Sequence, residues 1–159
     1  MADRSRTWSG RSGSRGLVAD LVPVEVEALV IDASAIVRGA LVDQLTGLSA
    51  YALQAPSLLW SEVASALSQL RYRAEISDDE ATRALDRILA HPIAIHSSRD
   101  IVASAIALAR QLGWAKTYDA EYLALAQQLN VRLLTNDAGL HRFAIANTRI
   151  VGPAELLDG

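Results

Sequence analysis

The stretch between Thr117 and Asp137, TYDAEYLALAQQLNVRLLTND, constrains the fold most, because it predicts a helix that leads directly into a strand. Apolar residues recur at helical spacing as far as Asn130, and the apolar run at 131–135 is typical of a buried strand. Asp119 lies just inside the helix, and Asp137 follows the strand. Ligands of open α/β sheets bind beyond the carboxyl ends of the strands, so the two carboxylates predict a site there.

The rest of the chain repeats this alternation of strands and helices. We expect further strands at residues 28–34, 53–55, 93–97 and 149–151, and further helices at 35–45, 57–73, 77–90, 98–112 and 137–144. Such an order predicts an α/β fold in which a parallel sheet is covered by helices.

Several helix boundaries are predicted from capping signals. Ser34 is expected to cap the helix that follows it, and Gly47 is expected to end that helix. Pro56 is expected to open the next helix, because proline is favoured in the first turn. Ser77, followed by Glu80 three residues later, forms the signal of a capping box.

Composition places the chain among globular, single-domain proteins. The 159 residues are 51% hydrophobic and include no cysteine, which excludes disulfides, thiolate metal ligands and cysteine nucleophiles. The sequence holds no apolar run long enough to cross a membrane and no signal-peptide pattern. We therefore expect a cytoplasmic protein with no membrane partner.

The N-terminal residues are basic, whereas the rest of the chain is acidic. The first 16 residues carry four arginines and one aspartate among Ser and Gly, so we expect a disordered basic tail at residues 1–20 and a folded domain at 28–153. The net charge of the chain is −3, and the +3 of those 16 residues leaves −6 for the rest. An acidic body disfavours nucleic-acid binding by charge alone, unless several acids are committed to metal ions.

Four carboxylates lie in apolar surroundings: Asp32 after the first strand, Glu62 on the apolar side of a helix, Asp119 and Asp137. Such a carboxylate is costly unless it is paired or binds a metal ion. Taken singly, Asp119 and Asp137 are explained as helix caps and Asp32 as a turn residue, whereas Glu62 lies in mid-helix. Together, the four acids predict a site for one or two Mg²⁺ or Mn²⁺ ions, which prefer carboxylate and water oxygens.

The segments around these four acids resemble, in the same order, the motifs of PIN-domain nucleases. The matching segments are VIDASAIV, APSLLWSEVASAL, TYDAEYLALA and LLTND. The chain is most similar to the VapC-type toxins of bacterial toxin–antitoxin pairs, and the resemblance runs over residues 28–151. It departs from the family in the two dozen residues that precede the first motif, and in the residue before the last aspartate.

The resemblance implies a three-layer α/β/α PIN-like fold with a central, mainly parallel sheet of four to five strands. It implies a Mg²⁺- or Mn²⁺-dependent endoribonuclease with RNA as its substrate, a small antitoxin that neutralises it, and a homodimer. The residues it implies at the metal are Asp32, Asp119 and Glu62 as main ligands and Asp137 through water or on a second ion, with Ser34, Thr135 and Asn136 orienting carboxylates or waters around them.

Other functions remain open at this point. A PIN-domain ribonuclease of RNA processing or quality control, without an antitoxin, would carry the same residues. A phosphotransferase with Asp32 as nucleophile would want a second aspartate at position 34, where the chain has Ser34. A non-catalytic PIN-like interaction module is disfavoured, because all four acids are present.

Contacts to an RNA backbone are expected from basic residues near the motifs. The candidates are Arg38, Arg71, Arg73, Lys116 and the arginines of the basic tail, and for each of them a solvated surface position is an equally good interpretation. Trp60 and Trp114 are interpreted as core or interface residues rather than as base-stacking platforms. The three histidines follow no pattern that suggests a role.

Overall fold

The computed structural model describes residues 26–143 and 148–157. In that part of the chain, five parallel strands form one sheet in the order β3-β2-β1-β4-β5. The strands are β1 (Glu27–Ile31), β2 (Tyr51–Pro56), β3 (Ile93–His96), β4 (Arg132–Leu134) and β5 (Ile150–Val151). The parallel sheet expected from the sequence is confirmed. The tail expected at residues 1–20 lies outside the described residues.

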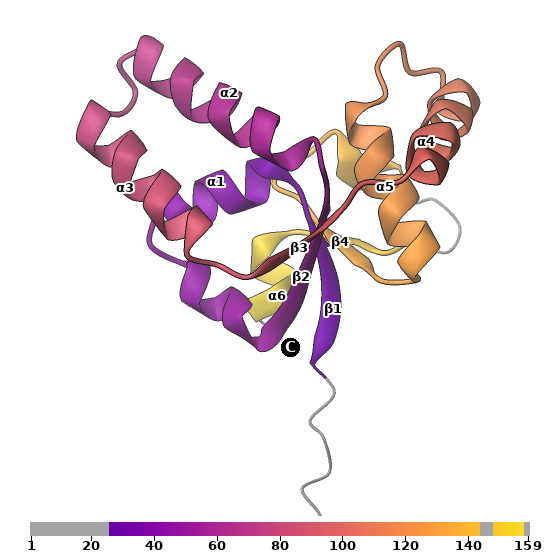
Figure 1. Cartoon of the computed structure of the whole chain (residues 1–159), viewed down its shortest axis with the longest axis horizontal. Helices are drawn as coiled ribbons and strands as arrows, with labels where there is room; N and C mark the ends of the chain where they lie inside the picture. Colours follow the sequence, from indigo (N-terminus) through magenta and orange to yellow (C-terminus); the bar gives the residue numbers. More distant parts are fainter. Residues whose placement is uncertain (1–25, 144–147, 158–159) are drawn as a thin grey trace, which may run out of the picture.

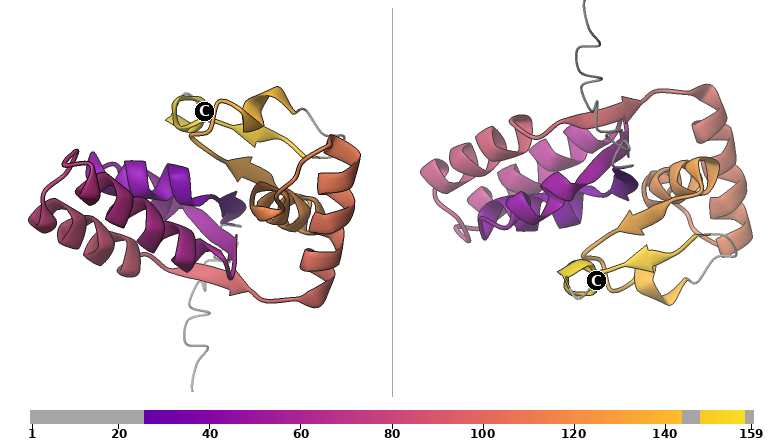
Figure 2. Two further views of the ribbon diagram at one scale, coloured as in Figure 1. Left: turned by 90° about the horizontal axis from the view of Figure 1, so that it is seen from above. Right: turned by 90° about the horizontal axis from the view of Figure 1, so that it is seen from below.

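Helices cover both faces of this sheet, which makes the fold three-layered as predicted. They are α1 (Ala33–Leu41), α2 (Leu59–Tyr72), α3 (Asp78–Leu89), α4 (Arg99–Leu112), α5 (Tyr118–Leu129) and α6 (Pro153–Leu157), with short 3-10 helices η1 (Leu45–Ala50) and η2 (Leu140–Arg142). Helices α1, α2 and α3 lie on one side of the sheet and α4 and α5 on the other, as Figure 1 and the two turned views of Figure 2 show. None of the described helices is long and apolar enough to cross a membrane.

The sheet order places a switch point between β1 and β4. From β1 the chain moves outward through β2 to β3, and it then returns to β4 and β5 on the other side of β1. The connections on the two sides use helices on opposite faces of the sheet. In folds of this kind the crevice beyond the switch point is the usual ligand site. A ligand site is therefore expected at the carboxyl ends of β1 and β4.

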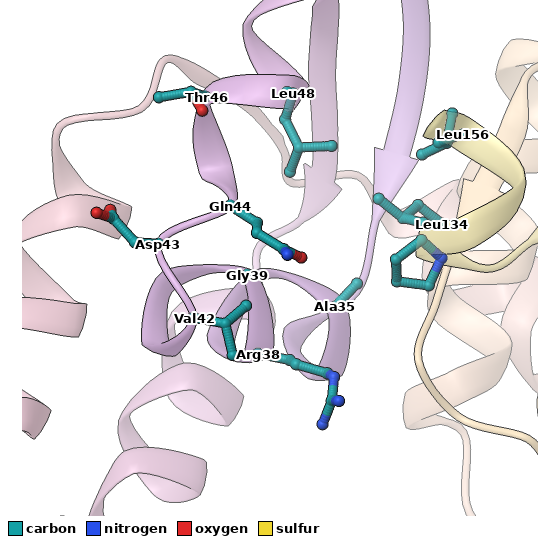
Figure 3. Close-up of a pocket in the computed structure, with 12 residues that line it drawn as sticks. Ala35, Arg38, Gly39, Val42, Asp43, Gln44, Thr46, Leu48, Leu134 and Leu156 are labelled. Atoms are coloured by element: carbon teal, nitrogen blue, oxygen red, sulfur yellow. The ribbon is translucent and has the colours of Figure 1, made fainter. Parts of the chain in front are cut away.

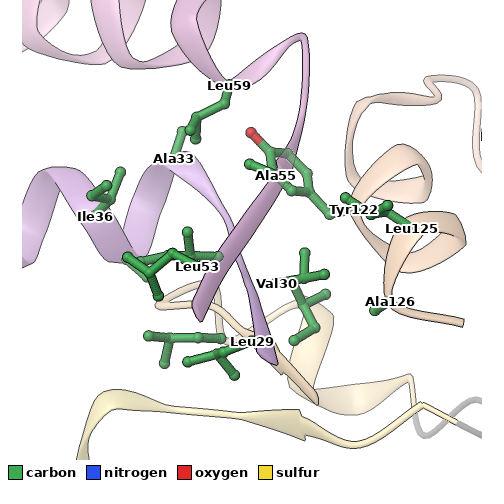
Figure 4. Packing of buried hydrophobic residues seen from close by; sticks show 14 of the residues in the cluster. Leu29, Val30, Ala33, Ile36, Leu53, Ala55, Leu59, Tyr122, Leu125 and Ala126 are labelled. Carbon is green, nitrogen blue, oxygen red and sulfur yellow. The ribbon is translucent and has the colours of Figure 1, made fainter. Parts of the chain in front are cut away.

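The core lies between the central strand and the two helical layers. Leu29, Val30 and Ile31 of β1 are inaccessible to solvent, as expected of a parallel strand covered on both faces. In α5, residues 122–126 are all buried, because this helix is enclosed by both the sheet and α4. Figure 4 shows Tyr122 reaching from α5 toward β2, among the aliphatic side chains of this core.

The capping box of α3 and the ends of α4 and α5 lie where the sequence predicted them. The Ser77 and Glu80 capping box is formed, with the Ser77 backbone N–H donating to Glu80 Oε2 at 2.8 Å. Gly113 and Asn130 end α4 and α5 in the left-handed conformation, with φ of 72° and 54°. Glycine adopts this conformation without a steric cost, and asparagine tolerates it better than most residues.

The prediction that Ser34 caps the first helix is wrong. Asp32 is the N-cap of α1, and its side chain accepts a hydrogen bond from the Ala35 backbone N–H. A carboxylate directly after a strand satisfies the free N–H groups of the first turn, so helix and strand meet with no intervening loop. The helix also ends at Leu41 rather than near Gly47, because Asp43 turns the backbone to φ of 58° and a separate 3-10 helix follows.

Two further helix predictions are corrected. Pro56 is the last residue of β2 and does not open α2. It lies beyond the last β2 residue that pairs with β1, so its missing N–H removes no hydrogen bond between these two strands. The helix expected at 137–144 is replaced by η2, because the Asp137 side chain accepts from the Gly139 backbone N–H in a local turn. Residues 144–147 lie outside the described part. Helix α6 was not predicted.

Candidate active site

Asp32 lies at the carboxyl end of β1 and is almost fully buried. Its Oδ1 accepts hydrogen bonds from the Ala35 backbone N–H at 2.8 Å and from the Ser34 hydroxyl at 2.7 Å. Its Oδ2 accepts a hydrogen bond from the Thr135 hydroxyl. Three donors thus fix the plane of this carboxylate, which is what a buried acid requires.

The end of β4 is tied to the same carboxylate. Thr135 is fully buried, and besides donating to Asp32 it accepts a hydrogen bond from the Asp137 backbone N–H at 3.0 Å. The Ser34 hydroxyl accepts from the Asn136 backbone N–H at 2.9 Å. The three positions predicted to orient the acids therefore join the ends of β1 and β4 in one hydrogen-bonded network. Asn136 contributes through its backbone.

Glu62 reaches this region from the first turn of α2. The hydroxyl of Tyr122, on α5, donates to Glu62 Oε2 at 2.7 Å. Sequence reasoning placed Tyr122 only in the apolar stripe of its helix. A phenol three residues after Asp119 and inside an aliphatic stripe was the one signal that could have identified it as a polar partner.

The remaining two acids are more exposed than Asp32. Asp119 lies in the first turn of α5, as predicted, and its side chain makes no hydrogen bond to another described residue. Asp137 follows β4, and its Oδ1 accepts from the Gly139 backbone N–H. All four predicted acids line one pocket of about 300 Å³, together with Ser34, Tyr122 and the polar side chains of Ser65 and Gln69.

Burial and mutual repulsion weaken the acidity of three of these carboxyl groups. Burial raises the pKa of Asp32, its hydrogen bonds oppose this, and the charge of Asp119 adds to it. Burial likewise raises the pKa of Glu62, against the Tyr122 hydrogen bond. Partial burial and the charge of Asp137 raise the pKa of Asp119. These shifts indicate acids that are crowded together without a compensating cation.

Two further groups affect Glu62. Glu121, which is also in the first turn of α5 and was absent from the predicted site, adds a repulsive charge that raises the pKa of Glu62. Burial and the hydrogen bond to Glu62 raise the pKa of Tyr122 well above its usual range, so this phenol stays protonated and acts as a donor. The network is therefore arranged to keep Glu62 hydrogen-bonded through Oε2.

The donor set of this pocket suits a hard divalent cation. In the described residues, none of the four carboxylates forms an ion pair with lysine, arginine or histidine. Carboxylate and hydroxyl oxygens are the ligands that Mg²⁺ and Mn²⁺ prefer. Across residues 26–143 and 148–157, however, no three acidic or histidine side chains converge closely enough to form a ready metal-binding cluster. The residues fit the ion by chemistry, and additional ligands would have to come from water or substrate.

The basic candidates differ in their surroundings. Arg71 pairs with Asp78 at 3.2 Å and Arg73 with Glu75 at 3.8 Å, both on the exposed surface. Arg38 lines a small pocket that also contains Ser34 and Asn136 of the site network. Lys116 lines a different pocket, which also contains Asp119 and Asp137.

Arg38 also borders a larger hollow on the α1 side of the sheet. This pocket of about 330 Å³ lies between α1, η1 and α6, and Figure 3 shows Arg38 at one edge of it with Val42, Leu134 and Leu156 around it. It contains none of the four predicted acids. We therefore assign the candidate chemistry to the acidic pocket rather than to this one.

Comparisons with known proteins agree on one family. A family model described as PIN domain matches residues 29–146. Ribonuclease VapC1 from two strains of Mycobacterium tuberculosis is 37% identical over 122 residues, which is 72% of this chain and 90% of the relative.

Three solved structures share the fold. PAE2754 from Pyrobaculum aerophilum has a TM-score of 0.64 at 25% identity, covering 84% of this chain and 95% of that one. VapBC2 from Rickettsia felis, bound to a DNA fragment from their promoter, has a TM-score of 0.55 at 17% identity, over 79% and 98% of the two chains. A toxin–antitoxin complex from Klebsiella pneumoniae has a TM-score of 0.53 at 19% identity, over 76% and 94%.

Proposed function

The chain belongs to the PIN-domain family, and we propose that it is a metal-dependent endoribonuclease of the VapC type, which hydrolyses RNA and is neutralised by a small antitoxin. One observation carries the proposal: four carboxylates from four separate segments line one pocket at the switch point of the sheet. The 37% identity to a ribonuclease over most of its length supports RNA as the substrate.

The proposed ligands of the metal are Asp32, Glu62 and Asp119, with Asp137 acting directly or through water. A bound Mg²⁺ or Mn²⁺ would offset the negative charge of the phosphodiester and make water more acidic. We propose these two ions because hard divalent cations prefer carboxylate oxygens as ligands.

The protein's own contribution is to hold these acids in place. The hydrogen bonds from Ala35, Ser34 and Thr135 orient Asp32 before any ligand arrives. The Tyr122 hydroxyl donates to Oε2 of Glu62, and no hydrogen bond between Oε1 and another described residue competes with a ligand there. Side chains held in this way need little reorganisation when substrate binds, which is the usual source of electrostatic catalysis.

The partners of the proposed toxin follow from the same family. They are an RNA substrate, a small antitoxin and a second copy of the chain in a homodimer, all in the cytoplasm. Their support is the resemblance to VapC-type toxins. An open reading frame for a small DNA-binding protein beside the gene would support the antitoxin, and its absence would favour a ribonuclease of RNA processing.

A single experiment tests the activity. Purified wild-type protein and the Asp119→Asn variant are incubated with total RNA in Mg²⁺ or in EDTA, and new RNA ends are mapped. We expect new ends only for the wild type in Mg²⁺. Asp100→Asn is the matched control, because Asp100 occupies the first turn of α4 as Asp119 does in α5, but lies outside the acidic pocket. Equal cleavage by wild type and Asp119→Asn would overturn the proposal.

The toxin assignment needs a second measurement in cells. Induced expression of the wild type is expected to arrest growth, with the same RNA ends as in vitro, whereas Asp119→Asn is expected to allow growth. Cleavage in vitro without growth arrest would support the ribonuclease activity and contradict the assignment as a toxin.

A further inference from the structure

A second pocket adjoins the acidic pocket and shares Asp119 and Asp137 with it. Its volume is about 450 Å³, and its lining includes Trp114, Phe143 and Lys116. We propose that this pocket binds the nucleotide next to the cleaved phosphodiester of a single-stranded RNA, with the base against Trp114 and a phosphate at Lys116. The inference rests on the proposed ribonuclease function and adds to it a place for the substrate.

The backbone between α4 and α5 brings these groups to the acids. Gly113 ends α4 in the left-handed conformation, and the Trp114 backbone N–H then donates to the Ala109 carbonyl at 2.8 Å. This turn holds the backbone of Trp114, and Lys116 follows it on the short connection that precedes α5. Asp119 follows in the first turn of that helix, so one continuous segment supplies an aromatic ring, a cation and a carboxylate.

The aromatic wall of the pocket is held in position before any ligand binds. Trp114 is half-buried and packs against the core, in keeping with the interpretation from the sequence, but it also lines the pocket, and this second contact is the reason to revise the view that it does not stack on bases. Its ring lies edge-to-face with that of Phe143, at 4.9 Å between centroids and 83° between planes. Aromatic side chains of this kind bind nucleobases by stacking, with little dependence on sequence.

The charge of the pocket favours a phosphate at Lys116. Carboxylates on one side repel an RNA backbone, so a cation is needed where the strand approaches. Arg71 and Arg73 are engaged with Asp78 and Glu75, whereas Lys116 forms no ion pair with any residue of the described ranges. Lys116 is also the cation that shares a pocket with two of the acids.

The position of Trp114 beside the acids favours single-stranded over double-stranded RNA. A base that lies against Trp114, beside Asp119 and Asp137, has left any helical stack. Proteins read such unstacked bases in single strands, loops and bulges, rather than in duplex RNA. The pocket therefore predicts cleavage in single-stranded segments.

Base removal combined with substitution tests the aromatic contact. The cleavage site of a short single-stranded RNA is mapped with the wild type, and variants of that RNA are made with one base missing at each flanking position. We expect one abasic position to raise KM on the order of tenfold, and Trp114→Leu to raise KM for the intact RNA by a similar factor. In the Trp114→Leu protein the abasic position should then cost nothing more, and Trp114→Phe should recover most of the loss.

Salt dependence tests the phosphate contact. Lys116→Gln is expected to lower the slope of log KM against log salt by about 0.7, the value for one phosphate contact to a single strand. Arg132→Gln, which removes an arginine paired with Glu27 at the amino end of β4, the end away from the acids, should leave the slope unchanged.

The outcomes separate this inference from the function on which it rests. Equal abasic penalties in the wild type and Trp114→Leu, with an unchanged salt slope in Lys116→Gln, would overturn the assignment of this pocket while leaving the ribonuclease in place. If the wild type cleaves no RNA in Mg²⁺, the proposed function itself is wrong. Thermal melts check folding, and should Trp114→Leu fail to fold, Trp114→Phe and Lys116→Gln decide the question.

Discussion

Asp119 is the acid whose charge the fold stabilises least. Its carboxylate accepts no hydrogen bond from another described residue, and both partial burial and the neighbouring Asp137 raise its pKa. A carboxyl group with a raised folded pKa favours the protonated form, so its stabilising contribution is present below the unfolded pKa and is lost as pH rises through the folded pKa. At neutral pH in EDTA the ionised Asp119 is therefore a source of instability.

Asp119→Asn should stabilise the metal-free protein while it abolishes metal-dependent cleavage. Because the side chain is only partly buried, solvent screening limits the gain to about 0.5 kcal/mol, or a rise in Tm of roughly 1–2 °C. The gain should appear in EDTA at pH 7.5 and fade as the pH falls toward 4. Melting curves of wild type, Asp119→Asn and Asp100→Asn check this. A lower Tm for Asp119→Asn at pH 7.5 would contradict it.

Tyr122→Phe isolates the hydrogen bond that holds Glu62. The substitution keeps the buried ring and removes the hydroxyl that donates to Glu62 Oε2. We expect a loss of about 1 kcal/mol in the free energy of unfolding, and a roughly tenfold weaker apparent affinity for Mg²⁺, the usual effect of losing a group that orients a metal ligand. Mg²⁺ titrations followed by Tm measure both.

Tyr118→Phe is the control for that measurement. Tyr118 lies one turn before Tyr122 on the same helix, is exposed, and is not among the residues that line the acidic pocket. It should leave Tm and Mg²⁺ affinity as in the wild type. If the two variants behave alike, the Tyr122 hydroxyl does not position Glu62.

At the scale of elements, Thr135 joins the ends of the two strands that flank the switch point. Its hydroxyl links Asp32, after β1, to the Asp137 backbone, after β4. Thr135→Val keeps the shape but leaves a buried carboxylate oxygen without this donor, which costs about 1–3 kcal/mol and should reduce cleavage at least tenfold. Thr135→Ser retains the hydroxyl and should stay close to the wild type in both. Equal losses in Val and Ser would point to packing rather than to the hydrogen bond.

This network also shows what the sequence could and could not predict about elements. The helical period of α5, the capping box of α3 and the glycine after α4 are local signals, and each located its helix correctly. The role of Asp32 as cap was missed, because Ser34 and Asp32 are both good caps and only the geometry at the end of β1 decides between them. The short η2 in place of a helix depends on a side-chain turn at Asp137 that propensity does not capture.

At the scale of the molecule, the meeting of the four acids was predictable and their connections were not. An acid after each of two strands, one at the start of a helix and one on the apolar side of another helix predict convergence at one edge of a parallel sheet. Glu62 was expected in mid-helix, and the structure places it in the first turn of α2. The hydrogen bond between Tyr122 and Glu62 joins residues 60 positions apart, on helices from opposite faces of the sheet. Such a contact depends on sheet order and helix packing, which no local pattern specifies.

The acidic pocket should make the stability of the whole molecule depend on Mg²⁺ and pH together. Burial and repulsion raise the pKa values of Asp32, Glu62 and Asp119, so in EDTA their contribution to stability declines as pH rises from about 4 through the raised values. Mg²⁺ binds the ionised carboxylates and offsets their repulsion. Its stabilising effect should therefore grow over the same pH range.

We expect Mg²⁺ at 100 times its Kd to stabilise the protein by about 2.7 kcal/mol at pH 7.5, a rise in Tm of several degrees. At pH 4.5 the rise should be much smaller, because protons compete with the ion for the same oxygens. Melts in Mg²⁺ and in EDTA at both pH values measure the difference. Asp119→Asn should lose most of the Mg²⁺ effect, and Asp100→Asn should keep it. A Tm rise that is equal at the two pH values, or equal in Asp119→Asn and the wild type, would mean that Mg²⁺ binds elsewhere than at these carboxylates.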